Sequence, residues 1–172
     1  FYAPHGGSLH HDPKSLSGRA YFRIERGLER LSDGLVFVSG YEQNVYAANV
    51  GAPRVPSVQV RNGLRPAEFD PVIPEPDVAD FLFIGMMRDL KGPDVLIDAL
   101  KDLEVRHGRK ARALFVGDGP DLESYVARAA ERGLNGNVRF VPPMPAREAF
   151  ARARTVVVPS RAESSPYIVL ET

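Results

Sequence analysis

Residues 81–103 read FLFIGMMRDLKGPDVLIDALKDL, an apolar run followed by a loop between two glycines and then an amphipathic segment. The run Phe81–Ile84 predicts a buried strand, because a short apolar block bounded by turn residues is typical of one. Pro93 is favourable at the first position of a helix, so a helix is predicted to begin there. Its apolar residues recur at helical spacing and are expected to form a buried stripe: Val95, Leu96, Ala99, Leu100 and Leu103.

The same alternation of strand and helix extends in both directions along the chain. Further strands are predicted at residues 35–38, 113–116, 138–141 and 155–158. Helices are predicted at residues 18–31, 40–49, 120–133 and 146–153, the first with Leu28 and Leu31 on one face. Ser39 and Glu42 have the spacing of a capping box at the start of the second. This alternation indicates an α/β fold, a Rossmann-like parallel sheet with flanking helices.

A proline-rich segment separates two parts of the chain. Between residues 52 and 80 lie six prolines, at positions 53, 56, 66, 71, 74 and 76, and proline at this density favours an extended linker. We therefore expect part of an N-terminal domain at 1–51, a hinge and linker at 52–80, and a C-terminal domain at 81–172. The sequence starts at Phe1 without a methionine and stops at Thr172 inside an expected helix, so a truncated fragment is expected.

Composition excludes several classes of function. Lys+Arg and Asp+Glu both number 22, so no basic excess indicates nucleic-acid binding. The sequence has no cysteine, which excludes disulfides and thiolate metal sites. A metal site at His10, His11 and Asp12 is not expected, because no second cluster would complete its coordination shell, and no cofactor is expected. Apolar runs such as 155–158 are too short to cross a bilayer, and with no visible signal peptide we expect a cytoplasmic protein.

The segment that follows the last predicted strand carries two carboxylates. Glu163 and Glu171 are separated by seven residues, and between them Pro166 marks an expected helix start. Such an N-terminus attracts phosphate through free amides, here those of residues 167–169, and carboxylates accept hydrogen bonds from diols. With Glu171 about two turns into the helix, the segment could hold hydroxyls, a diphosphate and hydroxyls in order, which describes a nucleotide sugar. The alternative is a surface helix with two solvated glutamates, since this spacing also arises by chance.

Other motifs accompany this segment in a fixed order. They are Tyr-Ala-Pro-His-Gly at 2–6, Val-Arg-Asn-Gly-Leu at 60–64, Phe-Ile-Gly through Lys-Gly at 83–92, Val-Gly-Asp-Gly-Pro at 116–120, and Pro-Ser-Arg-Ala-Glu through Glu at 159–171. Together they resemble the group 1 (family 4) retaining glycosyltransferases. The resemblance implies a GT-B fold, with 1–51 from the acceptor-side domain and 81–172 from the domain that binds the nucleotide sugar.

The resemblance also implies roles for individual residues. Glu163 would contact the donor sugar, Glu171 the ribose hydroxyls, and Lys91 the diphosphate as it leaves. His5 would face the transferred sugar from the opposite domain, which makes His5, Lys91 and Glu163 the expected catalytic residues. From the residues alone, Lys91 also fits a solvated loop lysine, and His5 fits a loop histidine that caps local backbone.

The remaining donor-binding residues surround the same expected site. Gly117 and Gly119 would form a tight turn that lets the ligand approach, and Gly85 would bind the donor from the loop that ends at Lys91. Met144, in the stretch 142–144, would border the base pocket, to which a proline-stiffened turn is the alternative. Ser165, Tyr167 and Ile168 would surround the diphosphate at the helix start. The family usually has arginine directly after the loop glycine; here Met86 stands there, and Arg88 is expected to supply the charge.

The expected activity is therefore that of a hexosyltransferase. It would move a sugar from a UDP- or GDP-type donor to a saccharide, lipid or small-molecule acceptor with retention at the anomeric carbon. A nucleotide-sugar epimerase or a phosphorylase of similar fold remains an alternative, as does a catalytically silent nucleotide-binding fragment, because a fold alone does not establish function. The fragment itself is expected to be inactive, to self-associate through an exposed core face, and to contact membranes only through regions outside this sequence.

Overall fold

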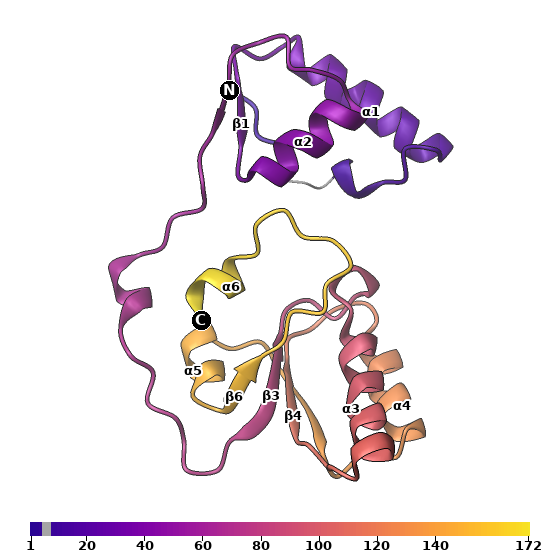
Figure 1. Cartoon of the computed structure of the whole chain (residues 1–172), viewed down its shortest axis with the longest axis vertical. Helices are drawn as coiled ribbons and strands as arrows, with labels where there is room; N and C mark the ends of the chain where they lie inside the picture. Colours follow the sequence, from indigo (N-terminus) through magenta and orange to yellow (C-terminus); the bar gives the residue numbers. More distant parts are fainter. Residues whose placement is uncertain (5–7) are drawn as a thin grey trace. The chain divides into compact units, whose positions relative to one another are not determined.

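The computed structural model describes residues 1–4 and 8–172. It contains two compact units, each with its own core. Unit 1 consists of Phe1–Gly63 with Glu163–Tyr167, and unit 2 consists of Leu64–Ala162 with Ile168–Thr172. In Figure 1 the chain is coloured from indigo at the N-terminus to yellow at the C-terminus.

Unit 2 is built on a four-stranded parallel sheet. Its strands are β3 (Ala79–Ile84), β4 (Ala113–Val116), β5 (Val138–Val141) and β6 (Ala153–Val156), in the order β5-β4-β3-β6. The register places Phe83 beside Phe115 and Phe115 beside Phe140. The predicted parallel sheet is confirmed, although β6 begins two residues before the predicted position.

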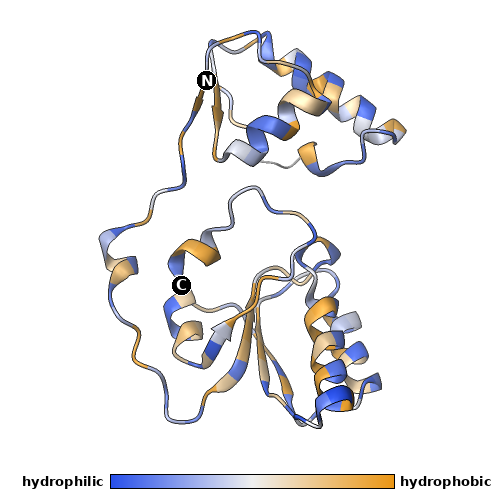
Figure 2. Ribbon diagram, in the orientation of Figure 1, coloured by the Kyte–Doolittle hydropathy of each residue, from blue (hydrophilic) through white to orange (hydrophobic). Residues whose placement is uncertain are grey.

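Helices cover both faces of this sheet. Helices α3 (Pro93–His107) and α4 (Leu122–Glu131) lie side by side on one face, and the short α5 (Ala146–Phe150) packs on the other (Figure 1). Side chains alternate between the two faces of a strand, so Phe83 and Phe115 join the α3–α4 side while Leu82 and Leu114 join the α5 side. The strands β3 and β4 are accordingly mostly hydrophobic in Figure 2.

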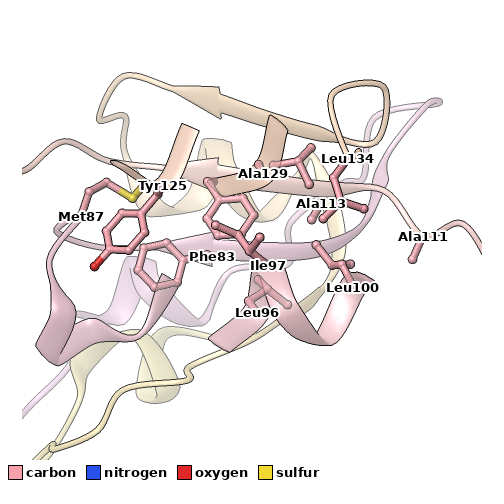
Figure 3. Close-up of a cluster of buried hydrophobic side chains, with 12 residues drawn as sticks. Phe83, Met87, Leu96, Ile97, Leu100, Ala111, Ala113, Tyr125, Ala129 and Leu134 are labelled. Carbon is pink, nitrogen blue, oxygen red and sulfur yellow. The ribbon is translucent and has the colours of Figure 1, made fainter. Parts of the chain in front are cut away.

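The α3–α4 side holds the larger apolar core. Phe115 is fully buried, and its ring centroid lies 5.6 Å from that of Phe83 and 4.9 Å from that of Phe140. Ile97 of α3 and Tyr125 of α4 belong to the same cluster (Figure 3). Burying one such side chain stabilises a fold by about 1.5–3 kcal/mol, so this cluster is the main support of unit 2.

The buried stripe of α3 differs from the predicted one. Leu96 and Leu100 are buried as predicted, but the fully buried position between them is Ile97. Val95 is 45% exposed and Ala99 is also exposed, so their prediction was wrong. The helix begins at Pro93 and ends at Gly108, whose φ is 62°, as predicted. Several residues of α3 satisfy helical spacing, and only packing against the sheet selects the face.

Unit 1 contains a small parallel sheet and two helices. Strand β1 (Leu35–Phe37) pairs with β2 (Ser57–Gln59), and Tyr2 forms a bridge to Leu35. Helices α1 (Leu16–Glu29) and α2 (Gly40–Asn49) belong to the same unit. Strand β2 thus lies inside the segment predicted as hinge and linker, and unit 1 continues to Gly63. Three 3-10 turns are also described, η1 (Ser8–His10) in unit 1 and η2 (Pro66–Phe69) and η3 (Asp89–Lys91) in unit 2, and helix α6 (Tyr167–Glu171) lies close to the C-terminus.

Three buried glutamates line the core of unit 1, and we call Glu25, Glu29 and Glu42 the carboxylate core. Glu29 is 1% exposed and accepts hydrogen bonds from Arg26 Nη1 at 2.7 Å, from Tyr46 Oη at 3.4 Å and from the Arg54 amide. Burial by itself would raise the pKa of Glu29, but these donors together hold it below its usual value. Glu25 accepts from the Tyr2 hydroxyl at 2.6 Å.

The face of α1 that was expected to be apolar is not the buried one. Leu28 is 37% exposed, and Leu31, which is 85% exposed, lies beyond the end of α1, whereas Phe22 and the two glutamates of the helix are buried. The capping box is also half formed, since Ser39 Oγ accepts from the Glu42 amide at 3.1 Å but the Glu42 carboxylate accepts from the Val38 amide at 2.8 Å. Glu42 therefore fixes the end of β1 rather than the helix cap.

Candidate functional site

The loops that follow β3 and β4 lie against one another through their backbones. The Gly85 amide donates to the Val116 carbonyl at 3.0 Å, and the Met87 amide donates to the Asp118 carbonyl at 2.9 Å. Gly117 has a φ of 147°, and a Cβ there would collide with the carbonyl oxygen of Gly85. Glycine is needed at this position because another backbone, rather than a ligand, occupies the space where a side chain would start.

A cavity of about 250 Å³ opens at these loops, at the carboxyl ends of the central strands. Its lining is mostly apolar and comes from three strand-end loops: Ile84, Gly85, Met86, Val116, Gly117, Asp118, Pro143 and Met144. We call this hollow the strand-end cavity. It brings together Gly85, Gly117 and Met144, which the sequence predicted to share a site, and adds Met86, which is 51% exposed. Its volume lies below the roughly 300–1,000 Å³ of pockets that enclose a complete ligand.

The two basic residues that were predicted to bind the diphosphate, Arg88 and Lys91, lie at the start and at the end of η3. Arg88 is exposed and directly precedes this turn, and Lys91 is its last residue and is half-buried. The Lys91 amide donates to the Arg88 carbonyl at 3.0 Å. Neither side chain lines the strand-end cavity, so the structure places the two cations on the neighbouring turn rather than in the wall of that cavity.

The turn that carries Lys91 is joined to the loop after β6 by an arginine that sequence reasoning missed. Arg161 donates to both carboxylate oxygens of Asp94, at 3.0 Å and 2.6 Å, and to the Asp89 carbonyl at 2.6 Å. The hydrogen bond from Arg161 lowers the pKa of Asp94, and the same bond raises the pKa of Arg161. The two residues are 67 positions apart in the chain, and no short-range pattern could have paired them.

The segment with the two predicted carboxylates is divided between the units. Glu163, Ser165 and Tyr167 belong to unit 1, and Ile168 and Glu171 belong to unit 2. Within unit 1 the Asn62 side-chain amide donates to the Ser165 carbonyl at 3.0 Å.

Helix α6 (Tyr167–Glu171) has only five residues. Glu171 is therefore its last residue, and the prediction that it lies two turns into the helix was wrong. Even from the expected start at Pro166, Glu171 is only five residues further on, which is about 1.4 turns at 3.6 residues per turn.

Glu171 lies at a different hollow from the strand-end cavity. It lines a space of about 470 Å³ together with residues of η2, of the following linker and of α5, and this space shares no lining residue with the strand-end cavity. Glu171 is therefore not among the lining residues of the strand-end cavity, whereas Gly85 and Met144 are. His5 lies outside the described residues.

In residues 1–4 and 8–172, no group of three or more His, Cys, Asp or Glu side chains could hold a metal ion. His11 instead stacks on Tyr21, with ring centroids 4.3 Å apart. Within the same part of the chain, each helix is too short or too polar to span a membrane.

The sequence also matches a known family. The model of the family described as glycosyl transferases group 1 matches residues 66–172, which is more than half of the chain. The chain belongs to the group 1 glycosyltransferase family. This match covers the sheet of unit 2, the strand-end cavity and the loop that carries Arg161.

The group 1 chain is similar in sequence to curated D-inositol 3-phosphate glycosyltransferases. It is 38% identical over 106 residues to a D-inositol 3-phosphate glycosyltransferase of Nocardia farcinica, which covers 56% of this chain and 23% of the relative. It is 32% identical over 130 residues to D-inositol 3-phosphate glycosyltransferase 2 of Catenulispora acidiphila, covering 69% of this chain and 30% of the relative. The chain thus spans about a quarter of the length of these relatives.

Solved glycosyltransferase structures share the fold. Anabaena Alr3699/HepE, solved in complex with UDP-glucose, matches with a TM-score of 0.80 at 18% identity, over 99% of this chain and 49% of that one. WaaG, a glycosyltransferase involved in lipopolysaccharide biosynthesis, matches with a TM-score of 0.71 at 19% identity, over 91% and 46% of the two chains. The predicted GT-B fold is confirmed by these neighbours.

Proposed function

We propose that this chain supplies the donor side of an enzyme that transfers a hexose from a nucleoside diphosphate sugar to an acceptor. The strand-end cavity is the observation that carries the proposal. It lies at the carboxyl ends of parallel strands, where ligands bind in open α/β sheets, and its walls of methionine, proline and glycine suit the flat face of a nucleotide base. Membership of the group 1 family and the UDP-glucose bound to the similar HepE fold support a UDP- or GDP-type donor.

In the proposed reaction the bond between the anomeric carbon and the diphosphate oxygen breaks, and its electron pair leaves with the diphosphate. Positive charge develops on the sugar ring, and the acceptor oxygen attacks the anomeric carbon from the face that the diphosphate leaves, so the configuration is retained. The O–H bond of the acceptor breaks, and its proton passes to the departing diphosphate oxygen on the same face. Lys91 neutralises the leaving diphosphate, and a cation placed at developing charge acts most strongly in the transition state. In this proposal Glu163 holds the donor sugar, Glu171 the ribose, and His5 faces the sugar.

Calorimetric titration of the chain with UDP, GDP and ADP tests the donor site. We expect saturable binding of one nucleotide and about tenfold weaker binding by Met144→Ala, equivalent to about 1.4 kcal/mol. Val105→Ala is the matched control, because Val105 is an apolar residue of α3 that is 71% exposed and lies outside the cavity. A folded chain that binds none of the three nucleotides would contradict the proposal.

A second experiment separates the proposed transfer from its rivals. Incubation of the donor sugar with the chain's full-length enzyme but without acceptor would yield an epimerised donor if the protein were an epimerase. Turnover that requires inorganic phosphate would identify a phosphorylase. A transferase instead consumes donor in proportion to a saccharide, lipid or small-molecule acceptor.

A further inference from the structure

The loop after β6 is held against the turn between β3 and α3 at several points. The Arg161 amide donates to the Leu90 carbonyl at 2.9 Å, and the Arg161 side chain donates to the Asp89 carbonyl and to Asp94. Gly92 has a φ of 67°, and a Cβ there would collide with the carbonyl oxygen of Pro159. Backbone contact and side-chain contact therefore converge on a single joint between two loops.

The side-chain part of this joint has a geometry that only arginine provides. Two nitrogens of the Arg161 guanidinium meet the two oxygens of the Asp94 carboxylate, while Nη1 also reaches a backbone carbonyl. A lysine has a single ammonium and cannot form this planar, two-point contact. Asp94 is itself fixed, because it lies in the first turn of α3 directly after Pro93, where a carboxylate is favourable at a helix N-terminus.

The joint connects two segments that bear expected donor-binding residues. The turn on one side ends with Lys91, and the loop on the other side continues from Arg161 through Ala162 to Glu163. Carboxylate oxygens of Asp94 and Asp89 lie 2.6 Å and 3.6 Å from Arg161 Nη2, so two negative charges face the single positive charge of the guanidinium. The Arg161 guanidinium is thus paired with two acidic side chains and a backbone carbonyl, so we do not assign it to binding of the diphosphate.

We propose that Arg161 and Asp94 form a clamp that positions the loop after β6 for the donor sugar, an inference that rests on the donor-binding function proposed above. Arg161 is a positioning residue: it holds the start of the loop that leads to Glu163 and need not touch the ligand. A loop that is ordered before binding loses less conformational freedom when the ligand arrives. The clamp acts on the sugar side of the donor. Its loss therefore weakens binding of a nucleotide sugar more than binding of the free nucleotide.

The experiment compares four variants of the chain. Arg161→Ala and Asp94→Asn break the clamp, and Arg161→Lys keeps the charge without the two-point contact. Arg128→Ala is the matched control, because Arg128 forms a similar two-point pair with Asp98, joining α4 to α3, and acts on Asp94 only through an electrostatic interaction weaker than that of Arg161. Hydrogen exchange of amides in residues 158–163 and titration with UDP and UDP-glucose, or with GDP and GDP-mannose if the chain binds GDP, are measured for each.

Exchange tests the clamp without any ligand. We expect Arg161→Ala and Asp94→Asn to raise the amide exchange rates of residues 158–163 at least tenfold. Arg161→Lys should raise these rates by a smaller factor, and Arg128→Ala should leave them unchanged. Unchanged exchange in Arg161→Ala would overturn the clamp, whatever the chain binds. If the unaltered chain binds no nucleotide, the donor-binding function fails, and exchange alone decides whether the two loops are joined.

Titration tests the positioning role. We expect Arg161→Ala to weaken binding of the nucleotide sugar at least tenfold and binding of the free nucleotide less than threefold. The ratio of the two dissociation constants is the decisive readout, because general loss of structure would weaken both ligands alike. An equal loss for both, or a ratio that also changes in Arg128→Ala, would contradict positioning by Arg161.

Discussion

The two units of this chain bury different kinds of side chain. In unit 2 the buried residues around Phe115 are apolar, whereas the buried charged residues of the described chain, residues 1–4 and 8–172, are Glu25, Glu29 and Glu42 and all lie in unit 1. An apolar core is non-directional and tolerates small shifts. A carboxylate core depends on each donor being in place, because an unpaired buried charge is costly. The comparison therefore predicts that the two units fail in different ways.

The largest effect is expected from the centre of the apolar core. Phe115→Ala removes a fully buried ring that lies between Phe83 and Phe140, and such a truncation costs about 3–5 kcal/mol of unfolding free energy. Native-state hydrogen exchange, followed on peptides of unit 2, measures the loss. Phe115→Leu is the control, since it keeps most of the volume and should lose much less. An equal loss in both variants would contradict a packing explanation.

A smaller effect is expected from the carboxylate core. Glu29→Gln keeps the shape but removes the charge that Arg26, the Arg54 amide and Tyr46 face, and hydrogen bonds to charged groups contribute about 1.5–3 kcal/mol. We expect peptides of unit 1 to lose about 2 kcal/mol of protection against exchange. Glu123→Gln on the exposed side of α4 is the matched control and should change stability by less than about 0.5 kcal/mol.

The same variant makes a prediction about pH. The pKa of Glu29 is lowered in the fold, so its ionised form is the one that the fold stabilises. That stabilisation is fully present above the usual glutamate value of 4.5 and is lost as the pH falls through the lower pKa of the folded state. The difference between Glu29→Gln and the unaltered chain should therefore shrink below about pH 4.5. A difference that grows in acid would show that Glu29 is already protonated in the fold.

Sequence reasoning predicted unit 2 better than unit 1 for a physical reason. The strands 113–116 and 138–141 were predicted with their observed bounds, because short runs rich in β-branched and aromatic residues between turn signals leave few alternatives. In unit 1 the helix α1 was assigned its apolar face at Leu28 and Leu31, since hydrophobic patterning treats a glutamate as a surface residue. The hydrogen-bond donors to Glu29 include the amide of Arg54, which is 25 positions away. A hydrophobic pattern within one helix does not predict a donor at that distance in sequence.

The residues of the candidate site also differ in whether a local sequence pattern could predict their arrangement. Gly85, Gly117 and Met144 were predicted together and do share the strand-end cavity, because parallel strands deliver their following loops to one edge. The clamp of Arg161 and Asp94 was missed, since it depends on the crossing of two loops that are distant in sequence. The roles of Lys91, Glu163 and Glu171 stay predictions, and Glu171 lines a hollow apart from that cavity.

The smallest effect is expected where the predicted stripe of α3 was wrong. Val95→Ala truncates a side chain that is 45% exposed and should change the unfolding free energy by less than about 0.5 kcal/mol. Ile97→Ala truncates a side chain of similar chemistry two positions later that is fully buried, and it should cost about 2–5 kcal/mol. Exchange of α3 amides compares the two directly. Equal losses would mean that α3 turns a different face to the sheet, because the energetic contrast between these positions comes from packing and not from helix propensity.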